Sequence, residues 1–182
     1  MNKTANKKRT SPATLLITGV ILVMIDQFTK YLAVSHLAGR DARVLIPGVL
    51  ELRYLENNGA AFSMLQNQQW FFYILTAVFL ILAIWLMRKV PRDTAAFNPL
   101  LWSLDILCAG AVGNLIDRIA HRYVVDFIYF SIINFPIFNV ADIYVTVSVI
   151  LLIILILFRY KDSDLQKIFG RKDSTDPKED AE

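Results

Sequence analysis

The chain has 182 residues, of which 55% are hydrophobic and 19% are charged, and its mean hydropathy is +0.46. This composition excludes an ordinary soluble globular domain and indicates an integral membrane protein, because a soluble domain of this length needs far less apolar residue. The formal net charge of +3 does not indicate nucleic-acid binding, and the single cysteine, Cys108, excludes an intrachain disulfide and argues against a thiolate metal site.

The first eleven residues are polar and basic, and residues 12–33 form the first apolar run. We interpret residues 1–11 as a cytoplasmic tail and residues 12–33 as an uncleaved signal-anchor helix. A cleaved signal peptide is the alternative. Against it, Asp26 and Lys30 interrupt the far end of the run, no clean small-x-small cleavage site follows, and further apolar runs come later.

Residues 36–69 are predicted to lie outside the membrane. Residues 39–43 are typical of a turn, and residues 49–54 alternate apolar and polar side chains, which predicts a strand on the membrane surface. The sequence NNGAAFS at residues 57–63 then ends the strand with small residues.

Three further apolar runs predict three more spans. The second span covers residues 70–87 and the third covers residues 97–116, with a short basic turn between them. Residues 117–136 are predicted to be outside again, with a strand at residues 123–129, and the fourth span ends at Phe158.

Lysine and arginine are concentrated at the two ends of the chain and in the middle turn, and they are fewer in the two outer loops. By the positive-inside rule, this distribution predicts four spans with both termini in the cytoplasm. We therefore expect a membrane all-α fold. A four-transmembrane-helix bundle occupies residues 12–158 with outer loops at residues 36–69 and 117–136, and a cytoplasmic tail follows at residues 159–182.

This topology puts two carboxylates, Asp126 and Asp142, on the same outer face. Each has an ordinary explanation on its own: Asp126 as a loop residue, and Asp142 as a helix-start residue favoured by the helix dipole. Two adjacent carboxylates do not both ionise readily and share a proton, which suits one as the base that activates water and the other as the acid. The pair therefore suggests aspartic-peptidase chemistry, for which spacing alone is a weak signal.

Asp26 and Lys30 are four residues apart at the outer end of the first span, so one helix face carries both as an ion pair. The pairing lowers the cost of each charge in the membrane, and we interpret the pair as structural. Ser63 with Lys30 is an alternative nucleophile and base, which we disfavour because Asp26 is the nearer partner of Lys30.

The third span contains GAVGN at residues 110–114, and Asp117 and Arg118 follow one turn later. Small residues at this spacing permit close helix packing, which explains the glycines without a further function. It does not explain Asn114, whose amide offers a donor and acceptors that suit holding a peptide backbone. Asp105, near the middle of the same span, has no evident partner in the sequence, and we expect it to be protonated or to face the bundle interior.

Other classes of membrane protein also use intramembrane carboxylates. A small transporter or proton-relay protein carries them along a path through the bilayer, whereas here all but Asp105 gather at one face. An intramembrane-cleaving aspartic peptidase carries its carboxylates deeper, and a non-catalytic assembly subunit would survive loss of both aspartates. His36 and His121 lack convincing metal-ligand companions.

Five motifs together resemble bacterial lipoprotein signal peptidase (signal peptidase II), from the first span to the start of the fourth. They are DQFTK at 26–30, NNGAAFS at 57–63, GAVGNLIDR at 110–118, VVDF at 124–127 and FNVAD at 138–142. The resemblance implies an aspartic peptidase of the bacterial cytoplasmic (inner) membrane, with its active site at the outer face under a small extracytoplasmic β-cradle. It also implies removal of the signal peptide from prolipoproteins that carry diacylglyceryl on the cysteine after the cut.

By position, the resemblance implies a catalytic dyad of Asp126 and Asp142, with Asp26 and Lys30 as a supporting pair. It implies that five residues shape the site and position substrate: Asn57, Gly110, Asn114, Arg118 and Asn139. The implied partners are lipidated prolipoproteins and membrane lipid, with the antibiotic globomycin as inhibitor, and the family uses no metal. Ala109, where the family usually has a glycine, is a departure that bears on helix packing.

Overall fold

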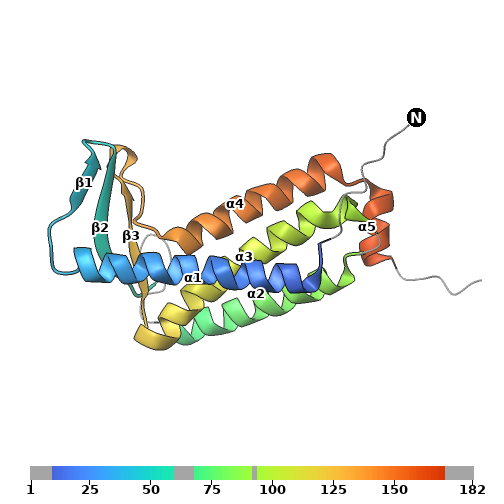
Figure 1. The fold of residues 1–182 in the computed structure, drawn as a ribbon, viewed down its shortest axis with the longest axis horizontal. Coiled ribbons are helices and arrows are strands. Elements are labelled where there is room, and N and C mark those ends of the chain that lie inside the picture. The colour runs from blue at the N-terminus through green and yellow to red at the C-terminus, as the bar shows by residue number, and fades with distance from the viewer. Residues whose placement is uncertain (1–9, 60–67, 92–93, 171–182) are drawn as a thin grey trace, which may run out of the picture.

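The computed structural model describes residues 10–59, 68–91 and 94–170. Four helices in it are long and apolar enough to cross a membrane. They are α1 (Pro12–Leu37), α2 (Gln69–Lys89), α3 (Asn98–His121, preceded by the 3₁₀ turn η2, Ala95–Phe97) and α4 (Val140–Ile154, continued by the π-helical turn η4, Leu155–Arg159). Figure 1 shows them side by side in an elongated bundle, which confirms the predicted fold class.

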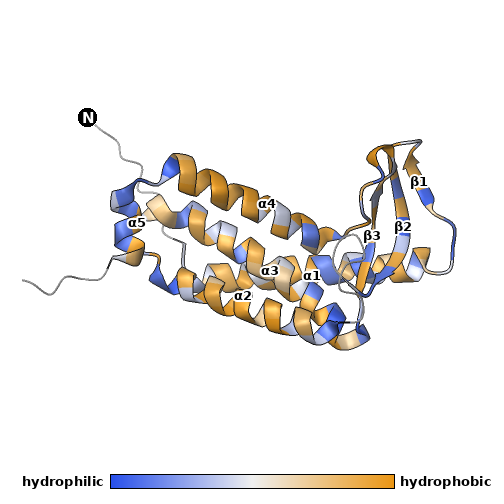
Figure 2. Cartoon of the chain, turned by 180° about the vertical axis from the view of Figure 1, so that it is seen from behind, coloured by the Kyte–Doolittle hydropathy of each residue, from blue (hydrophilic) through white to orange (hydrophobic). Residues whose placement is uncertain are grey.

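The outward faces of these helices are apolar. Ile17, Leu82 and Leu157 are 60%, 58% and 67% exposed, as are many similar side chains along the bundle. Such a surface would be costly in water but is matched to lipid. Figure 2 shows the resulting pattern, with hydrophobic colours along the helices and hydrophilic colours gathered toward the two ends of the bundle. α3 packs against each of the other three helices and is the central helix of the bundle.

A three-stranded antiparallel sheet lies across one end of the bundle (Figure 1). Its strands are β1 (Arg43–Ile46), β2 (Leu50–Asn57) and β3 (Val124–Phe130), in that order. Val125 and Phe127 of β3 are buried against Ala33 and Leu37 of α1, which attaches the sheet to the bundle. The β2–β3 register pairs Asn57 with Val124, so the end of β2 reaches the start of β3 beside the helices.

The opposite end of the bundle is closed by a second apolar cluster and by the short helix α5 (Asp162–Phe169). Phe97 stacks on Tyr160 with ring centroids 5.4 Å apart, and Ile168 of α5 and Leu15 of α1 are buried in the same cluster. α5 was not predicted. Its apolar residues Leu165, Ile168 and Phe169 are spaced as on one face of a helix, but a helix of eight residues is unstable until it packs on a surface.

The structure corrects several predicted boundaries. α1 continues to Leu37 beyond the predicted end at residue 33, and α3 continues to His121 beyond residue 116. Asp117 and Arg118 are therefore part of a helix, whereas they were predicted in an outer loop. β1 was also not predicted. All four of its residues are exposed, so it has no alternation of buried and exposed side chains. Residues 60–63 of the NNGAAFS motif, and Ser63 with them, lie outside the described residues, as do residues 1–9 and 171–182 of the predicted tails.

Candidate active site

The start of α4 is set by a reciprocal pair of hydrogen bonds between Asn139 and Asp142. Asn139 is the N-cap residue, and its Oδ1 accepts the backbone N–H of Asp142 at 3.0 Å. In return, Oδ2 of Asp142 accepts the backbone N–H of Asn139 at 3.1 Å. This capping box satisfies N–H groups that would otherwise be unpaired at a helix start in an apolar setting. It also locks the Asp142 carboxylate at the sheet end of the bundle.

Asp126 is brought to the same place by β3. Its side chain is 1% exposed, and its two oxygens accept the Asn139 Nδ2 at 2.7 Å and the Asn57 Nδ2 at 2.8 Å. Asn139 therefore bonds both carboxylates at once. The structure brings Asp126 and Asp142 together around this one asparagine, although they come from a strand and a helix sixteen positions apart.

Asn114 of α3 completes the arrangement. Its Nδ2 donates to Oδ1 of Asp142 at 2.8 Å, while its Oδ1 accepts Asn139 Nδ2 at 3.1 Å and Lys30 Nζ at 2.9 Å. Each of the four oxygens of the two carboxyl groups thus accepts one N–H from the surrounding residues. Burial has the largest effect on the pKa of Asp126, and the nearby charge of Asp142 has the second largest; both raise it. The hydrogen bonds that Asn57 and Asn139 donate to Asp126 lower the pKa, and the net result is a value of about 7. At neutral pH this pair is therefore suited to holding a single shared proton.

A buried ionic cluster lies on the bundle side of Asn114. Lys30 Nζ is 3.0 Å from Oδ2 of Asp26 and 3.0 Å from Oδ2 of Asp117, and all three side chains are almost fully buried. Gln27 Nε2 joins the two carboxylates, at 3.1 Å from Asp26 and 3.0 Å from Asp117. The predicted ion pair between Asp26 and Lys30 is confirmed. Lys30 also donates to Oδ1 of Asn114, so the Nδ2 of the same amide is the atom that faces Asp142.

Asp117 and Gln27 were missed as members of this cluster. Asp117 was assigned to a loop, yet it lies three residues after Asn114, on the same face of α3. Its Oδ2 also accepts the backbone N–H of Val125 at 3.0 Å, which ties the residue before Asp126 to the helix bundle. If the third span had been predicted one turn longer, the helical spacing would have placed Asp117 beside Asn114. No sequence pattern predicted that Gln27 belongs to the cluster.

Two glycines of α3 permit this close packing. A Cβ at Gly110 would lie 2.6 Å from the carbonyl oxygen of Ala141, and a Cβ at Gly113 would overlap the Asp26 carboxylate. The predicted packing role of the small residues is confirmed. Gly110 lies at the α3–α4 contact and is not part of the cavity wall described below, so its part in positioning substrate stays a prediction.

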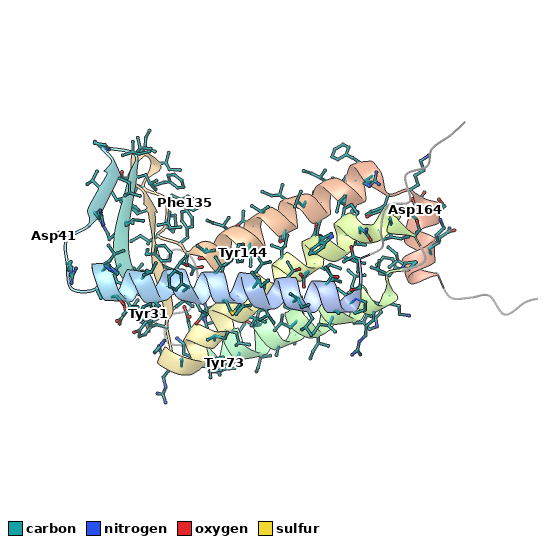
Figure 3. The ribbon with its side chains drawn as sticks, viewed as in Figure 1. Tyr31, Asp41, Tyr73, Phe135, Tyr144 and Asp164 are labelled. Carbon is teal, nitrogen blue, oxygen red and sulfur yellow. The ribbon has the colours of Figure 1, made fainter. Side chains whose placement is uncertain are left out.

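Arg118 lies at the side of the site on the last turns of α3. Its guanidinium donates to the carbonyl oxygens of Gly59 and Asn114, both at 3.3 Å, and sits 4.6 Å from the ring centroid of Phe72. The hydroxyl of Tyr73, labelled in Figure 3, donates to the Arg118 carbonyl at 2.7 Å. Arg118 therefore joins α3 to α2 and to the segment after β2, and it faces the same cavity as the carboxylates.

A cavity of about 850 Å³ lies between the sheet, the 134–138 segment and α4. Polar side chains in its lining include those of Asn57, Asn114, Arg118, Asp126 and Asp142. Apolar side chains in its lining include those of Phe135, Phe138, Ile143 and Val147. Figure 3 shows Phe135 between the sheet and the start of α4. The arrangement suits a substrate with a polar reacting group and an apolar attachment.

The buried carboxylate Asp105 lies outside this site. It is 7% exposed, it faces Gly19 of α1, and its Oδ2 has no hydrogen-bond partner in the described part of the chain. The prediction that it faces the bundle interior is confirmed. Within the described ranges, no group of three or more His, Cys, Asp or Glu side chains is arranged to hold a metal ion.

The chain is similar to a known protein family and to solved structures over most of its length. The family model of signal peptidase (SPase) II matches residues 18–158. Lipoprotein signal peptidases of Streptococcus pyogenes serotype M5 (strain Manfredo) and serotype M3 (strain SSI-1) are 44% and 43% identical over 138 residues, which are 74% of this chain and 87% of each relative. Two solved structures of bacterial membrane enzymes have TM-scores of 0.71 and 0.73 and are 31% and 35% identical. Their alignments cover 92% and 84% of this chain, and 98% of each solved chain.

Proposed function

This chain belongs to the signal peptidase II family of aspartic-type peptidases, and we propose that it removes the signal peptide from prolipoproteins whose cysteine after the cut already carries diacylglyceryl. The observation that carries this proposal is the pair Asp126 and Asp142, held by Asn139 at a cavity that is lined by both polar and apolar side chains.

Asp126 and Asp142 are the proposed catalytic dyad, and they share one proton at rest. The ionised carboxylate takes a proton from water as the water oxygen attacks the scissile carbonyl carbon, and the protonated carboxyl gives its proton to the carbonyl oxygen. When the resulting diol collapses, one hydroxyl returns its proton to the dyad, the C–N bond breaks, and the leaving amine takes a proton from the other carboxyl. The products are a peptide carboxyl group and a free amine on the cysteine, and the dyad keeps one proton.

The residues around the dyad have distinct proposed roles. Asn57 and Asn139 orient Asp126, and Asn114 and Asn139 orient Asp142, as their hydrogen bonds suggest. Arg118 supports the segment at Gly59 and offers a positive charge beside the cavity. Gly110 allows α4 to approach α3 closely enough for Asn114 to reach Asp142. Lys30 donates to the Asn114 oxygen, and Asp26 holds Lys30 in place.

Its four apolar helices make the chain a multi-pass membrane protein. We propose that it lies in the bacterial cytoplasmic (inner) membrane with both termini in the cytoplasm and the sheet and dyad at the outer face. The ends of α2 and α4 away from the sheet carry Arg88, Lys89 and Arg159, which is the charge pattern of a cytoplasmic face. Globomycin is the inhibitor that we expect to block the cavity.

The experiment that tests the proposal is cleavage of a diacylglyceryl-modified prolipoprotein by the purified protein in detergent, with the unlipidated precursor beside it. We expect cleavage of the lipidated substrate alone, before its cysteine, and inhibition by globomycin. Equal cleavage of both precursors would contradict the lipid requirement. A folded protein that cleaves neither would contradict the proposed function.

The pH dependence of kcat/KM tests the shared proton. Because the pKa of Asp126 is raised to about 7, the dyad loses its proton above this pH, and we expect kcat/KM to fall about tenfold per pH unit there. Asn57 donates to Asp126 and favours its ionised form. We therefore expect Asn57→Ala to raise this pKa and to move the alkaline limb to higher pH. Asn58→Ala, at the exposed next residue, is the control, and a limb that stays in place in Asn57→Ala would contradict the assignment.

A further inference from the structure

A second cavity lies at the end of the bundle away from the two carboxylates, beside the start of α3 and the end of α4. We call it the α5-end cavity, and its volume is about 340 Å³. This volume is at the lower end of the range for small-molecule sites, about 300–1,000 Å³. The residues that line it are Ala95, Ala96, Asn98, Pro99, Trp102 and Arg159, and none of them lines the cavity at the carboxylates.

Tyr160 joins the two walls of the α5-end cavity. Its hydroxyl donates to the carbonyl oxygen of Ala96 at 3.3 Å, and its ring stacks on Phe97. Arg159, the preceding residue, is thereby held beside the start of α3. It ends a π-helical turn in which the N–H of Tyr160 donates to the carbonyl oxygen of Leu155 at 3.0 Å. Such turns are rare and are frequent at functional sites, and the wider turn re-directs Arg159 relative to a continued α-helix.

The α5-end cavity lies in a positively charged region. Arg159 is exposed and takes part in none of the ion pairs that the described residues form with one another. Its guanidinium lies near the Tyr160 hydroxyl, a neutral group that does not cancel the charge. Other exposed cations at this end are Arg88, Lys89, Lys161 and Lys167. Asp162 and Asp164 of α5 are also here, and Asp164 pairs with Lys167. The cations outnumber these carboxylates, so an anion is favoured at Arg159.

The cavity also lies at the edge of the apolar surface. Leu157 and Phe158, directly before Arg159, are 67% and 80% exposed, so the guanidinium follows the last lipid-facing side chains of the span. Trp102 is partly buried and lies one turn from Pro99 on the same face of α3, toward the middle of the bundle. An indole suits this position, because its ring is apolar and its N–H is polar. The cavity thus combines a cation with an aromatic ring at the depth of a lipid headgroup.

We propose that the α5-end cavity binds the phosphodiester of one anionic phospholipid from the adjoining leaflet, with Arg159 on the phosphate and Trp102 against the glycerol and the first methylene groups. A guanidinium donates two parallel N–H groups to a phosphate, which suits this contact. A phosphatidylcholine headgroup would bring a second cation among the lysines and arginines, so a lipid with net negative charge is preferred. This inference goes beyond the peptidase activity and does not depend on it.

The test measures lipid binding to the delipidated protein in detergent by native mass spectrometry, with dioleoylphosphatidylglycerol and dioleoylphosphatidylcholine as probes. We expect one phosphatidylglycerol to bind about tenfold more tightly than phosphatidylcholine. Arg159→Gln should lower the affinity for phosphatidylglycerol by about tenfold and leave that for phosphatidylcholine unchanged. Arg88→Gln is the matched control, because Arg88 is an exposed arginine at the same end that does not line the cavity, and we expect a change of less than about threefold.

A second pair of variants tests the cavity without removing Arg159. Ala96 is exposed and lines the cavity, so Ala96→Glu places a negative charge there, whereas Ala96→Gln adds a neutral side chain of similar size. We expect Ala96→Glu to weaken phosphatidylglycerol binding by about tenfold relative to Ala96→Gln. This comparison decides the matter if Arg159→Gln does not fold.

Three results would overturn the inference. Equal affinity of the wild type for the two lipids would show that the charge of the headgroup is not recognised. Equal losses in Arg159→Gln and Arg88→Gln, or in Ala96→Glu and Ala96→Gln, would show that binding is not specific to the charge at this cavity. Displacement of phosphatidylglycerol by an equal concentration of inorganic phosphate would assign the cavity to a free anion and not to a lipid. Because cleavage is not measured, failure of the proposed function would leave this test unaffected.

Discussion

Asp126→Asn is expected to lower kcat for cleavage of the lipidated prolipoprotein by about 10³-fold or more while the protein stays folded. An amide in this position neither accepts the proton of water nor shares a proton with Asp142. The fold should tolerate the change, because burial already disfavours the ionised form of Asp126 at neutral pH. Turnover of the purified variant, with its thermal unfolding measured in the same detergent, checks both halves of this expectation.

Asp41→Asn is a suitable control for this substitution. Asp41 is exposed in the loop before β1, as Figure 3 shows, and it does not line the cavity. It loses the same charge, so any effect of net charge on substrate binding appears there as well. Asp142→Asn should be as damaging as Asp126→Asn. Near-normal cleavage by a folded variant at either position would remove that residue from the dyad.

The largest effect on stability is expected at Lys30. Its ammonium is 3.0 Å from the carboxylates of both Asp26 and Asp117, and Lys30→Met leaves these two buried groups without their cation. Removing one partner from a buried ion pair costs about 3–5 kcal/mol, because the remaining charge stays desolvated. We expect the free energy of unfolding in detergent to fall by about that amount. Chemical denaturation followed by circular dichroism gives the measurement.

An exposed ion pair gives the matched comparison. Lys167 is 60% exposed and pairs with Asp164 at 3.3 Å on α5, so Lys167→Met should lower the free energy of unfolding by no more than about 1 kcal/mol. If Lys30→Met is no more destabilising than Lys167→Met, the buried cluster does not stabilise the fold. Asp117→Asn should be milder than Lys30→Met, because an amide oxygen at this position still accepts the Val125 N–H.

The spans show how much of the fold a local pattern predicts. Long apolar runs predicted all four helices because lipid requires each span to be apolar and to satisfy its own backbone groups. Their ends were less well predicted: α3 continues past residue 116 because Asp117 is paired inside the bundle, which only the neighbouring helices make possible. β1 was not predicted because its four residues are too few to show an alternating pattern, and it forms a strand by pairing with β2.

For the site, the sequence by itself determined the residue types, their order and their gathering at one end of the bundle. The motifs then named Asp126 and Asp142, and the i,i+4 spacing predicted the pairing of Asp26 with Lys30. The tertiary structure decided which side chains are hydrogen-bond and ion-pair partners. Asn139 bonds both carboxylates, Lys30 donates to Asn114, and Asp117 and Gln27 complete the buried cluster. The physical reason is that hydropathy and helix periodicity act within one element. These bonds join α1, α3, β2, β3 and α4, so they depend on how closely packed helices and strands meet.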